Sequence, residues 1–133
     1  MGHENKDLII FDRVYQLCKW LYPAVGNYPR GQRYILGERA TGLATEILLM
    51  ISQANAEWSK TLTICGIVLR VRQLKTLLRL AMELKYLSFG QYEHAVGMVD
   101  EVGRLAWGWL KATLDKNANH NFYLGHLMTE GQS

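Results

Sequence analysis

The chain has 133 residues, of which 49% are hydrophobic and 20% charged, and its formal net charge at pH 7 is +3. This length and apolar content favour one folded domain and exclude a chain that is disordered throughout. The apolar runs are only a few residues long, and the N-terminus, MGHENKDL, has no apolar signal core. We therefore expect a cytoplasmic protein without a membrane partner.

The first predicted helix starts near Asp7, a plausible N-cap. One of its faces is apolar at helical spacing: Phe11, Val14, Tyr15, Cys18, Leu21, Tyr22 and Val25. Pro23 removes a backbone donor, so the helix should kink or end nearby. Gly26, Asn27, Pro29 and Gly31 follow, and they predict a connection.

A second helix is predicted from about Arg33 to about Ala56. Its apolar residues share one face: Leu36, Ala40, Leu43, Ile47, Met50, Ile51 and Ala54. Gly37 and Gly42 lie inside this helix, where each costs about 1 kcal/mol relative to alanine. These glycines indicate either a close approach of two helices or a tolerated local cost.

The stretch from Thr61 to Leu87 organises the chain, because a single predicted helix carries two apolar stripes. The first stripe suits the core of the domain: Ile64, Ile67, Val71, Leu74, Leu78 and Ala81. The second stripe needs a further helix, from this chain or from another subunit, to cover it: Leu62, Leu69, Leu77, Leu80, Leu84 and Leu87. Within the second stripe we expect Leu77, Leu80 and Leu84 to form a subunit interface.

Three cations, Arg72, Lys75 and Arg79, lie between the stripes at spacing i, i+3 and i+7, and we call them the basic row. The segment from Lys60 to Lys85 carries six lysines and arginines but one acidic residue, Glu83. The charge excess of this segment is larger than that of the whole chain, which points to an anionic partner such as nucleic acid or an acidic protein face. A solvated helix face that only keeps the protein soluble is the alternative.

The fourth helix is predicted from about Phe89 to about Leu114. Ser88 and Gln91 form a capping-box pattern at its start, in which each side chain bonds the backbone N–H of the other residue. Asp100 and Arg104 are spaced as an i, i+4 ion pair on its outer side. The inner stripe holds the apolar and small residues: Tyr92, Val96, Val99, Gly103, Ala106 and Leu110.

Trp107 and Trp109 flank Gly108 near the end of this helix, and we interpret both as packing residues rather than base-stacking ones. The four predicted helices, joined by short connections, form an all-α, antiparallel up-down four-helix bundle over residues 1–115. We expect this bundle to oligomerise through its second apolar stripe. The remaining residues, 116–133, are expected to form a C-terminal tail that is loosely ordered or docked on a neighbour.

The sequence offers little for catalysis or metal binding. The histidines, His3, His94, His120 and His126, are scattered, and no phosphate-binding loop is present. Cys18 and Cys65 lie in apolar helical patterns and are expected to be buried free thiols. We therefore expect a protein that is not an enzyme, with no catalytic residue, no metal and no cofactor.

The segment from Tyr28 to Arg39, YPRGQRYILGER, resembles a motif at the junction of the first two helices in a known family. This family is that of the accessory variability determinant proteins of diversity-generating retroelements, which are related to the proteins encoded in intervening sequences of bacterial 23S ribosomal RNA genes. The preceding residues Lys19 to Pro23 and the order of the helices also fit. The resemblance covers roughly residues 8–114. The intervening-sequence branch usually has an Ile-Ala-Glu-Gly-like stretch where this chain reads ISQANAE from Ile51 to Glu57.

This resemblance implies a non-catalytic, homopentameric ring that binds a reverse transcriptase and its template RNA, and supports mutagenic cDNA synthesis. The basic row of Arg72, Lys75 and Arg79 lies on the corresponding third helix. Arg30, Arg33 and Arg39 lie in the junction motif, where Arg33 and Arg39 either contact the partner or tie helix ends together. The alternatives are an intervening-sequence-type protein, a purely protein-binding helical adaptor, and a structural bundle whose basic row has no partner.

Overall fold

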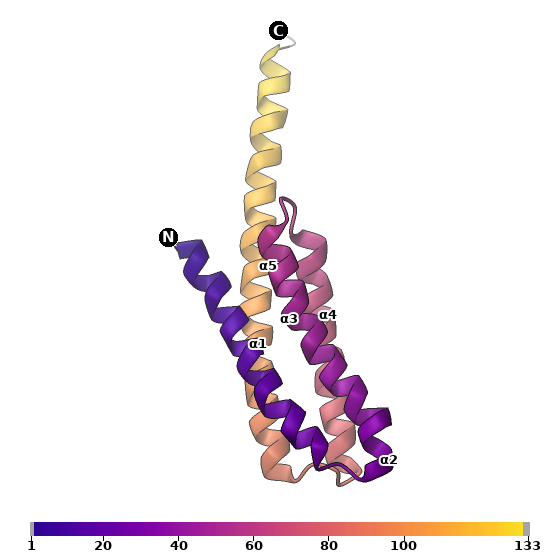
Figure 1. Cartoon of the computed structure of the whole chain (residues 1–133). Helices are drawn as coiled ribbons and strands as arrows, with labels where there is room; N and C mark the ends of the chain where they lie inside the picture. Colours follow the sequence, from indigo (N-terminus) through magenta and orange to yellow (C-terminus); the bar gives the residue numbers. More distant parts are fainter. Residues whose placement is uncertain (1, 132–133) are drawn as a thin grey trace.

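The computed structural model describes the backbone of residues 2–131 and the side chains of residues 9–119. Four long helices form an antiparallel up-and-down bundle over the described residues (Figure 1): α1 (Gly2–Gly26), α3 (Glu38–Ala56), α4 (Thr61–Glu83) and α5 (Phe89–Gly131). Helix α1 packs against α3 and α5, and α4 packs against the same two helices, so each helix has two antiparallel neighbours. The predicted four-helix bundle is confirmed. No described helix has an apolar stretch long enough to cross a lipid bilayer.

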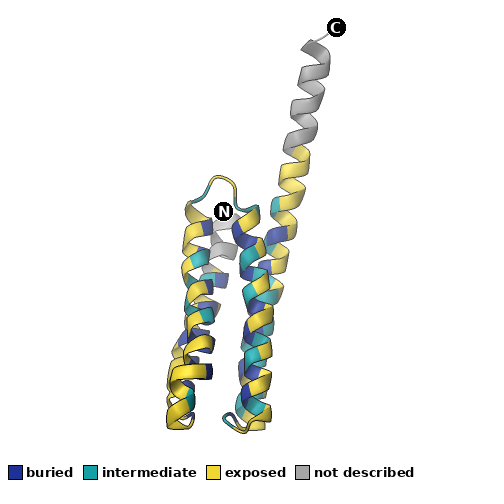
Figure 2. Ribbon diagram, turned by 90° about the vertical axis from the view of Figure 1, so that its right-hand side faces the viewer, coloured by how far each residue is buried: buried dark blue, intermediate teal, exposed yellow. Residues whose placement is uncertain are grey.

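The core lies between the four helices, and the buried residues face one another across it (Figure 2). Every residue of the first apolar stripe of α4 is buried, and Leu74 and Leu78 are 0% exposed. They meet the inner faces of α1, α3 and α5, represented by Val14, Ile47 and Val99. The periodicity of the sequence therefore identified the core side of α4 correctly.

The connection between α1 and α3 is helical almost throughout. Helix α1 ends at Gly26, just after Pro23, as predicted, although it begins at Gly2 rather than near Asp7. After a short turn, α2 (Arg30–Gln32) leads into the π-helical segment η1 (Arg33–Gly37), which continues directly into α3.

The two glycines of the second predicted helix have different roles. A Cβ atom added to Gly37 would clash with Cγ1 of Val25, so this glycine permits a close approach of η1 to α1. A Cβ atom added to Gly42 would meet open space. Of the two interpretations left open by the sequence, close approach therefore holds at Gly37, and a tolerated local cost holds at Gly42.

Helix α4 ends at Glu83, not at Leu87 as its apolar pattern predicted. Lys85 takes φ 66°, a left-handed backbone conformation that terminates the helix. The backbone N–H of Tyr86 bonds the Ala81 carbonyl at 2.8 Å, and that of Lys85 bonds the Met82 carbonyl at 2.9 Å. This is the hydrogen-bond pattern of a Schellman motif, formed with lysine where glycine is usual. Leu87 lies beyond the helix and is buried in the core.

Helix α5 begins at the predicted residue but ends beyond the predicted one. The Ser88 N–H bonds Gln91 Oε1 at 2.9 Å and the Gln91 N–H bonds Ser88 Oγ at 3.1 Å, which confirms the capping box. The helix does not end near Leu114 as predicted but continues to Gly131, so its backbone projects beyond the other helices (Figure 1). The expectation of a C-terminal tail that is loosely ordered or docked on a neighbour stays a prediction. No proline interrupts the stretch, and each added helical residue gains a hydrogen bond. The apolar cluster of the tail lies outside the described side chains, and the division at residue 115 stays a prediction.

Candidate nucleic-acid interface

The basic row lies on one side of α4, as predicted, but its members differ in their surroundings. Lys75 Nζ lies 2.6 Å from Asp100 Oδ1 on α5, and Arg79 Nε lies 3.1 Å from Glu83 Oε1. Arg72 is exposed, and no carboxylate within residues 9–119 forms an ion pair with it. The row is therefore partly neutralised. Asp100 pairs with Lys75 across helices, not with Arg104, which corrects the pair expected within the fourth helix.

The ion pair between Lys75 and Asp100 joins one side of α4 to one side of α5. Arg72 and Arg79 share the side of Lys75, because they stand three and four residues from it. Arg104 shares the side of Asp100, four residues on, and Lys111 follows on the same side two turns later. One continuous surface, which we call the α4–α5 face, therefore carries five cations: Arg72, Lys75, Arg79, Arg104 and Lys111.

Close packing of the two helices holds this face together. A Cβ atom added to Gly103 would lie 3.3 Å from Val71 Cγ1, so α5 approaches α4 closely there. Further along, the Asn117 side chain donates to the Thr61 hydroxyl at 3.0 Å. Together with the Lys75–Asp100 pair, these contacts fix the register of α5 on α4 over five turns of α5. Sequence reasoning left Arg104 and Lys111 out of the site, because only this register places them beside the basic row.

The acidic residues of the α4–α5 face gather toward one end. Glu83 ends α4 and Glu93 belongs to the first turns of α5, so both lie near the connection between these helices. Asp100 is engaged by Lys75 at the middle of the face. Glu101 pairs with Arg13 of α1, so the excess of positive charge lies farther along, around Arg72, Arg104 and Lys111 and before Asp115.

The three arginines of the junction motif do not form one cluster with the α4–α5 face. The Arg33 Nε–H donates to the Tyr28 carbonyl at 3.0 Å, which ties η1 to the turn that follows α1. Of the two roles left open for Arg33, the structure thus shows the structural contact. Arg30 and Arg39 are exposed and form no ion pair with another described residue. Their assignment to partner binding stays a prediction.

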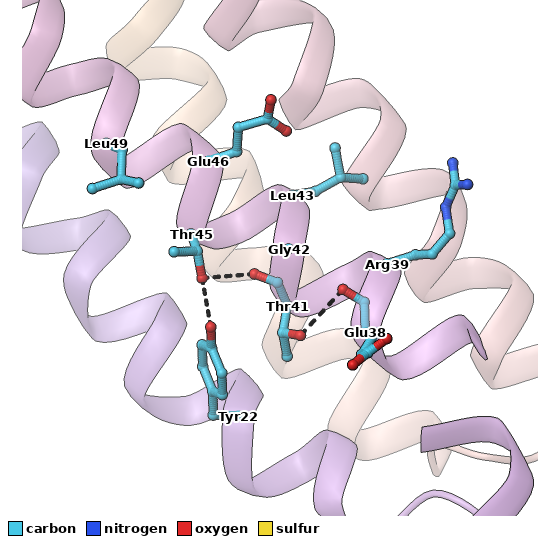
Figure 3. Close-up of a pocket in the computed structure, with 9 residues that line it drawn as sticks. All are labelled: Tyr22, Glu38, Arg39, Thr41, Gly42, Leu43, Thr45, Glu46 and Leu49. Carbon is cyan, nitrogen blue, oxygen red and sulfur yellow. Dashed lines mark hydrogen bonds between the residues drawn. The ribbon is translucent and has the colours of Figure 1, made fainter. Parts of the chain in front are cut away.

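An open groove lies along α3 beside Tyr22 of α1, and Arg39 is among the residues that line it (Figure 3). The hydroxyls of this groove bond locally: Tyr22 Oη and Thr45 Oγ1 are 2.7 Å apart, and Thr45 Oγ1 donates to the Thr41 carbonyl at 2.8 Å. The Thr41 hydroxyl donates to the Gly37 carbonyl at 3.1 Å. Each hydroxyl is engaged in a hydrogen bond, either between α1 and α3 or to a carbonyl one turn back along the helix, so we assign the groove no chemistry. Within the described residues no group of histidine, cysteine, aspartate or glutamate is arranged to hold a metal ion.

The second apolar stripe of α4 is mostly exposed within the single chain. Leu62 is 86% exposed, Leu80 43% and Leu84 48%, and Leu69 is also exposed. Leu77 differs, because it is half-buried and packs against the core. The proposed interface residues therefore divide into two available leucines, Leu80 and Leu84, and one that also supports the fold of the monomer.

The burial expected for the two cysteines and the packing role expected for Trp107 and Trp109 are each correct for one residue of the pair only. Cys18 is buried, and burial raises the pKa of its thiol, but Cys65 is exposed on the outer side of α4, so its expected burial is wrong. Trp109 packs against the core, with Lys60 Nζ 5.8 Å from its ring centroid. Trp107 is 59% exposed, which does not fit a packing role within the chain. In both pairs, apolar composition did not reveal which side of the helix each residue occupies.

Comparison with known protein families identifies the family of this chain. A family model described as bAvd-like matches residues 8–113, which is most of the chain, and the chain belongs to this family. No curated protein and no solved structure matches the sequence. The match agrees with the resemblance carried by the junction motif, and the family is one of accessory, non-catalytic proteins.

Proposed function

From this family membership, we propose that the chain is the accessory protein of a diversity-generating retroelement. In this role it binds the template RNA and the reverse transcriptase and supports mutagenic cDNA synthesis without performing catalysis. The α4–α5 face is the observation that carries the proposal. It gathers Arg72, Arg104 and Lys111 on a rigid surface where no described carboxylate pairs with them.

Phosphate contacts explain how such a face holds RNA. Each cation that neutralises a phosphate releases condensed counterions, so the affinity falls steeply as salt rises.

We also propose that the protein is a homo-oligomer, a pentamer by the family resemblance. The exposed leucines of α4 support self-association, and every added subunit presents a further copy of the face. Several weak contacts then act on one RNA molecule.

The proposal is tested by measuring RNA binding across a salt series. We expect purified protein to bind structured RNA tightly at low salt, with a steep linear decrease of log affinity against log salt. Arg72→Gln combined with Arg104→Gln should weaken binding to all RNA sequences about equally and lower the salt slope by about 0.7 to 0.9 for each lost phosphate contact. Lys19→Gln, on the exposed side of α1, is the control and should leave the slope unchanged.

Two results would contradict the proposal. Absence of RNA binding by the wild-type chain at low salt would leave a protein-binding helical adaptor as the better function. Equal loss in the Lys19→Gln control would mean that total charge, not the α4–α5 face, governs binding. Binding to a reverse transcriptase is tested separately, by co-purification with the reverse transcriptase of a diversity-generating retroelement, where the two should elute as one complex.

A further inference from the structure

Trp107 is the exposed tryptophan of the α4–α5 face. It is 59% exposed, whereas Trp20 and Trp109 are half-buried against the core. It stands three residues after Arg104 and four before Lys111, so all three side chains leave α5 on the same side. A large aromatic ring in the middle of a charged, solvated surface keeps most of its area in contact with water within the chain, and this exposed area is available to a ligand.

The charges around Trp107 favour an anion with exposed aromatic groups. Arg104 and Lys111 flank it along α5, and Arg72 lies on the same face of α4. The acidic residues nearest to it in sequence on its own helix are Asp100, which Lys75 engages, Glu101, which pairs with Arg13 of α1, and Asp115, which lies two turns away. The ring and its surrounding cations match the two parts of a single-stranded nucleic acid, whose bases stack on aromatic side chains while its phosphates meet arginine and lysine.

We propose that Trp107 is a base-stacking position for single-stranded RNA, with Arg104, Lys111 and Arg72 holding the flanking phosphates. The inference rests on the proposed function and deepens it, because it specifies an unpaired segment of the RNA as the ligand at this place. A duplex keeps its bases inside the helical stack and offers this ring only its backbone. A protein partner with an acidic surface would use the cations but would not need a base-stacking ring.

The test compares a short unstructured RNA with a duplex of the same length, using fluorescence anisotropy at several salt concentrations. Trp107→Ala should weaken binding of the unstructured RNA about tenfold or more, while its salt slope remains that of the wild type. Binding of the duplex should change less than twofold, and Trp107→Phe should retain most of the affinity for the unstructured RNA. Trp58→Ala is the matched control, because Trp58 is 102% exposed but lies in the α3–α4 connection.

A second readout follows the ring itself. The intrinsic fluorescence of the protein should be quenched when unstructured RNA binds, and Trp107→Phe should remove most of that quenching. Equal affinity of Trp107→Ala and wild type for unstructured RNA would overturn the inference while leaving the proposed function intact. Equal weakening for both RNAs with a reduced salt slope would also overturn it, because the effect would then be electrostatic. If the wild-type chain binds neither RNA, the proposed function itself fails.

Discussion

The two sides of α4 carry the same residue type in opposite surroundings. Leu74 and Leu78 on the inner side are 0% exposed, whereas Leu80 and Leu84 on the outer side are 43% and 48% exposed. Helices α3 and α5 cover the inner side, whereas the described part of the chain covers the outer side only in part. A leucine stabilises the monomer only if the chain itself supplies its neighbours. We therefore expect the outer leucines to contribute less to the fold of the single chain and more to the proposed self-association.

Replacing one leucine on each side gives the largest expected contrast. Leu78→Ala leaves a cavity in a packed interior and should lower the free energy of unfolding by about 2 to 5 kcal/mol. Leu80→Ala removes a side chain that is already in contact with water and should change the stability of the monomer by less than about 0.5 kcal/mol. Urea unfolding at low protein concentration measures both values. Similar losses would mean that the outer side is covered in the folded monomer.

The outer side should instead govern the mass of the assembly. Leu80→Glu combined with Leu84→Glu places two charges in the proposed interface and should weaken self-association at least about a hundredfold, close to 2.7 kcal/mol. Native mass spectrometry and circular dichroism should show smaller species with unchanged helical content. Leu77 is unsuitable for this test because it also packs against the core.

A matched substitution on another helix distinguishes an effect on the proposed interface from a general effect of adding charge to the surface. Leu49→Glu changes a leucine that is 64% exposed on α3 and should leave the native mass unchanged. An unchanged mass in the Leu80→Glu, Leu84→Glu variant would show that these two leucines do not form the interface. Loss of helical content in that variant would show that the outer side supports the monomer after all.

Much of this difference between the two sides of α4 could be predicted from the sequence, because helical periodicity shows which residues lie on the same side of a helix. Ile64, Val71 and Leu78 were placed on the inner stripe and are buried. The start of α5 was also predictable, since the capping box of Ser88 and Gln91 is a local pattern that requires only a few neighbouring residues. The exposed position of Leu80 is consistent with the prediction of a second apolar stripe.

Features that depend on contacts between distant residues could not be predicted in this way. The pairing of Lys75 with Asp100 needs the register of α5 on α4, which no local pattern contains. The end of α4 depends on Lys85 adopting a backbone conformation that usually requires glycine, so composition gave no signal for it. The same limit applies to Trp107, because its exposed position depends on the direction from which α4 meets α5.

Tyr28 gives the smallest expected effect. It is a buried residue that carries a polar atom, so it tests how apolar the covered side of the helices is. The side chain is 1% exposed, and its hydroxyl forms no hydrogen bond with another described residue. Burial raises the pKa of Tyr28 from an ordinary value of 10.0 to about 12. Below about pH 10, the folded and unfolded states both keep the phenol proton, so ionisation of this group does not lower the stability of the fold there.

Between about pH 10 and 12 the unfolded chain loses this proton and the folded chain retains it, so stability falls as the pH rises. The loss should be about 1 kcal/mol near pH 11. Tyr28→Phe removes the ionisable group and should unfold with a shallower alkaline dependence, measured by urea titration at a series of pH values. At neutral pH the variant should be as stable as the wild type or slightly more so, because the hydroxyl that it lacks has no partner to lose. Parallel pH dependences of the two proteins would show that the phenol is not held in an apolar site.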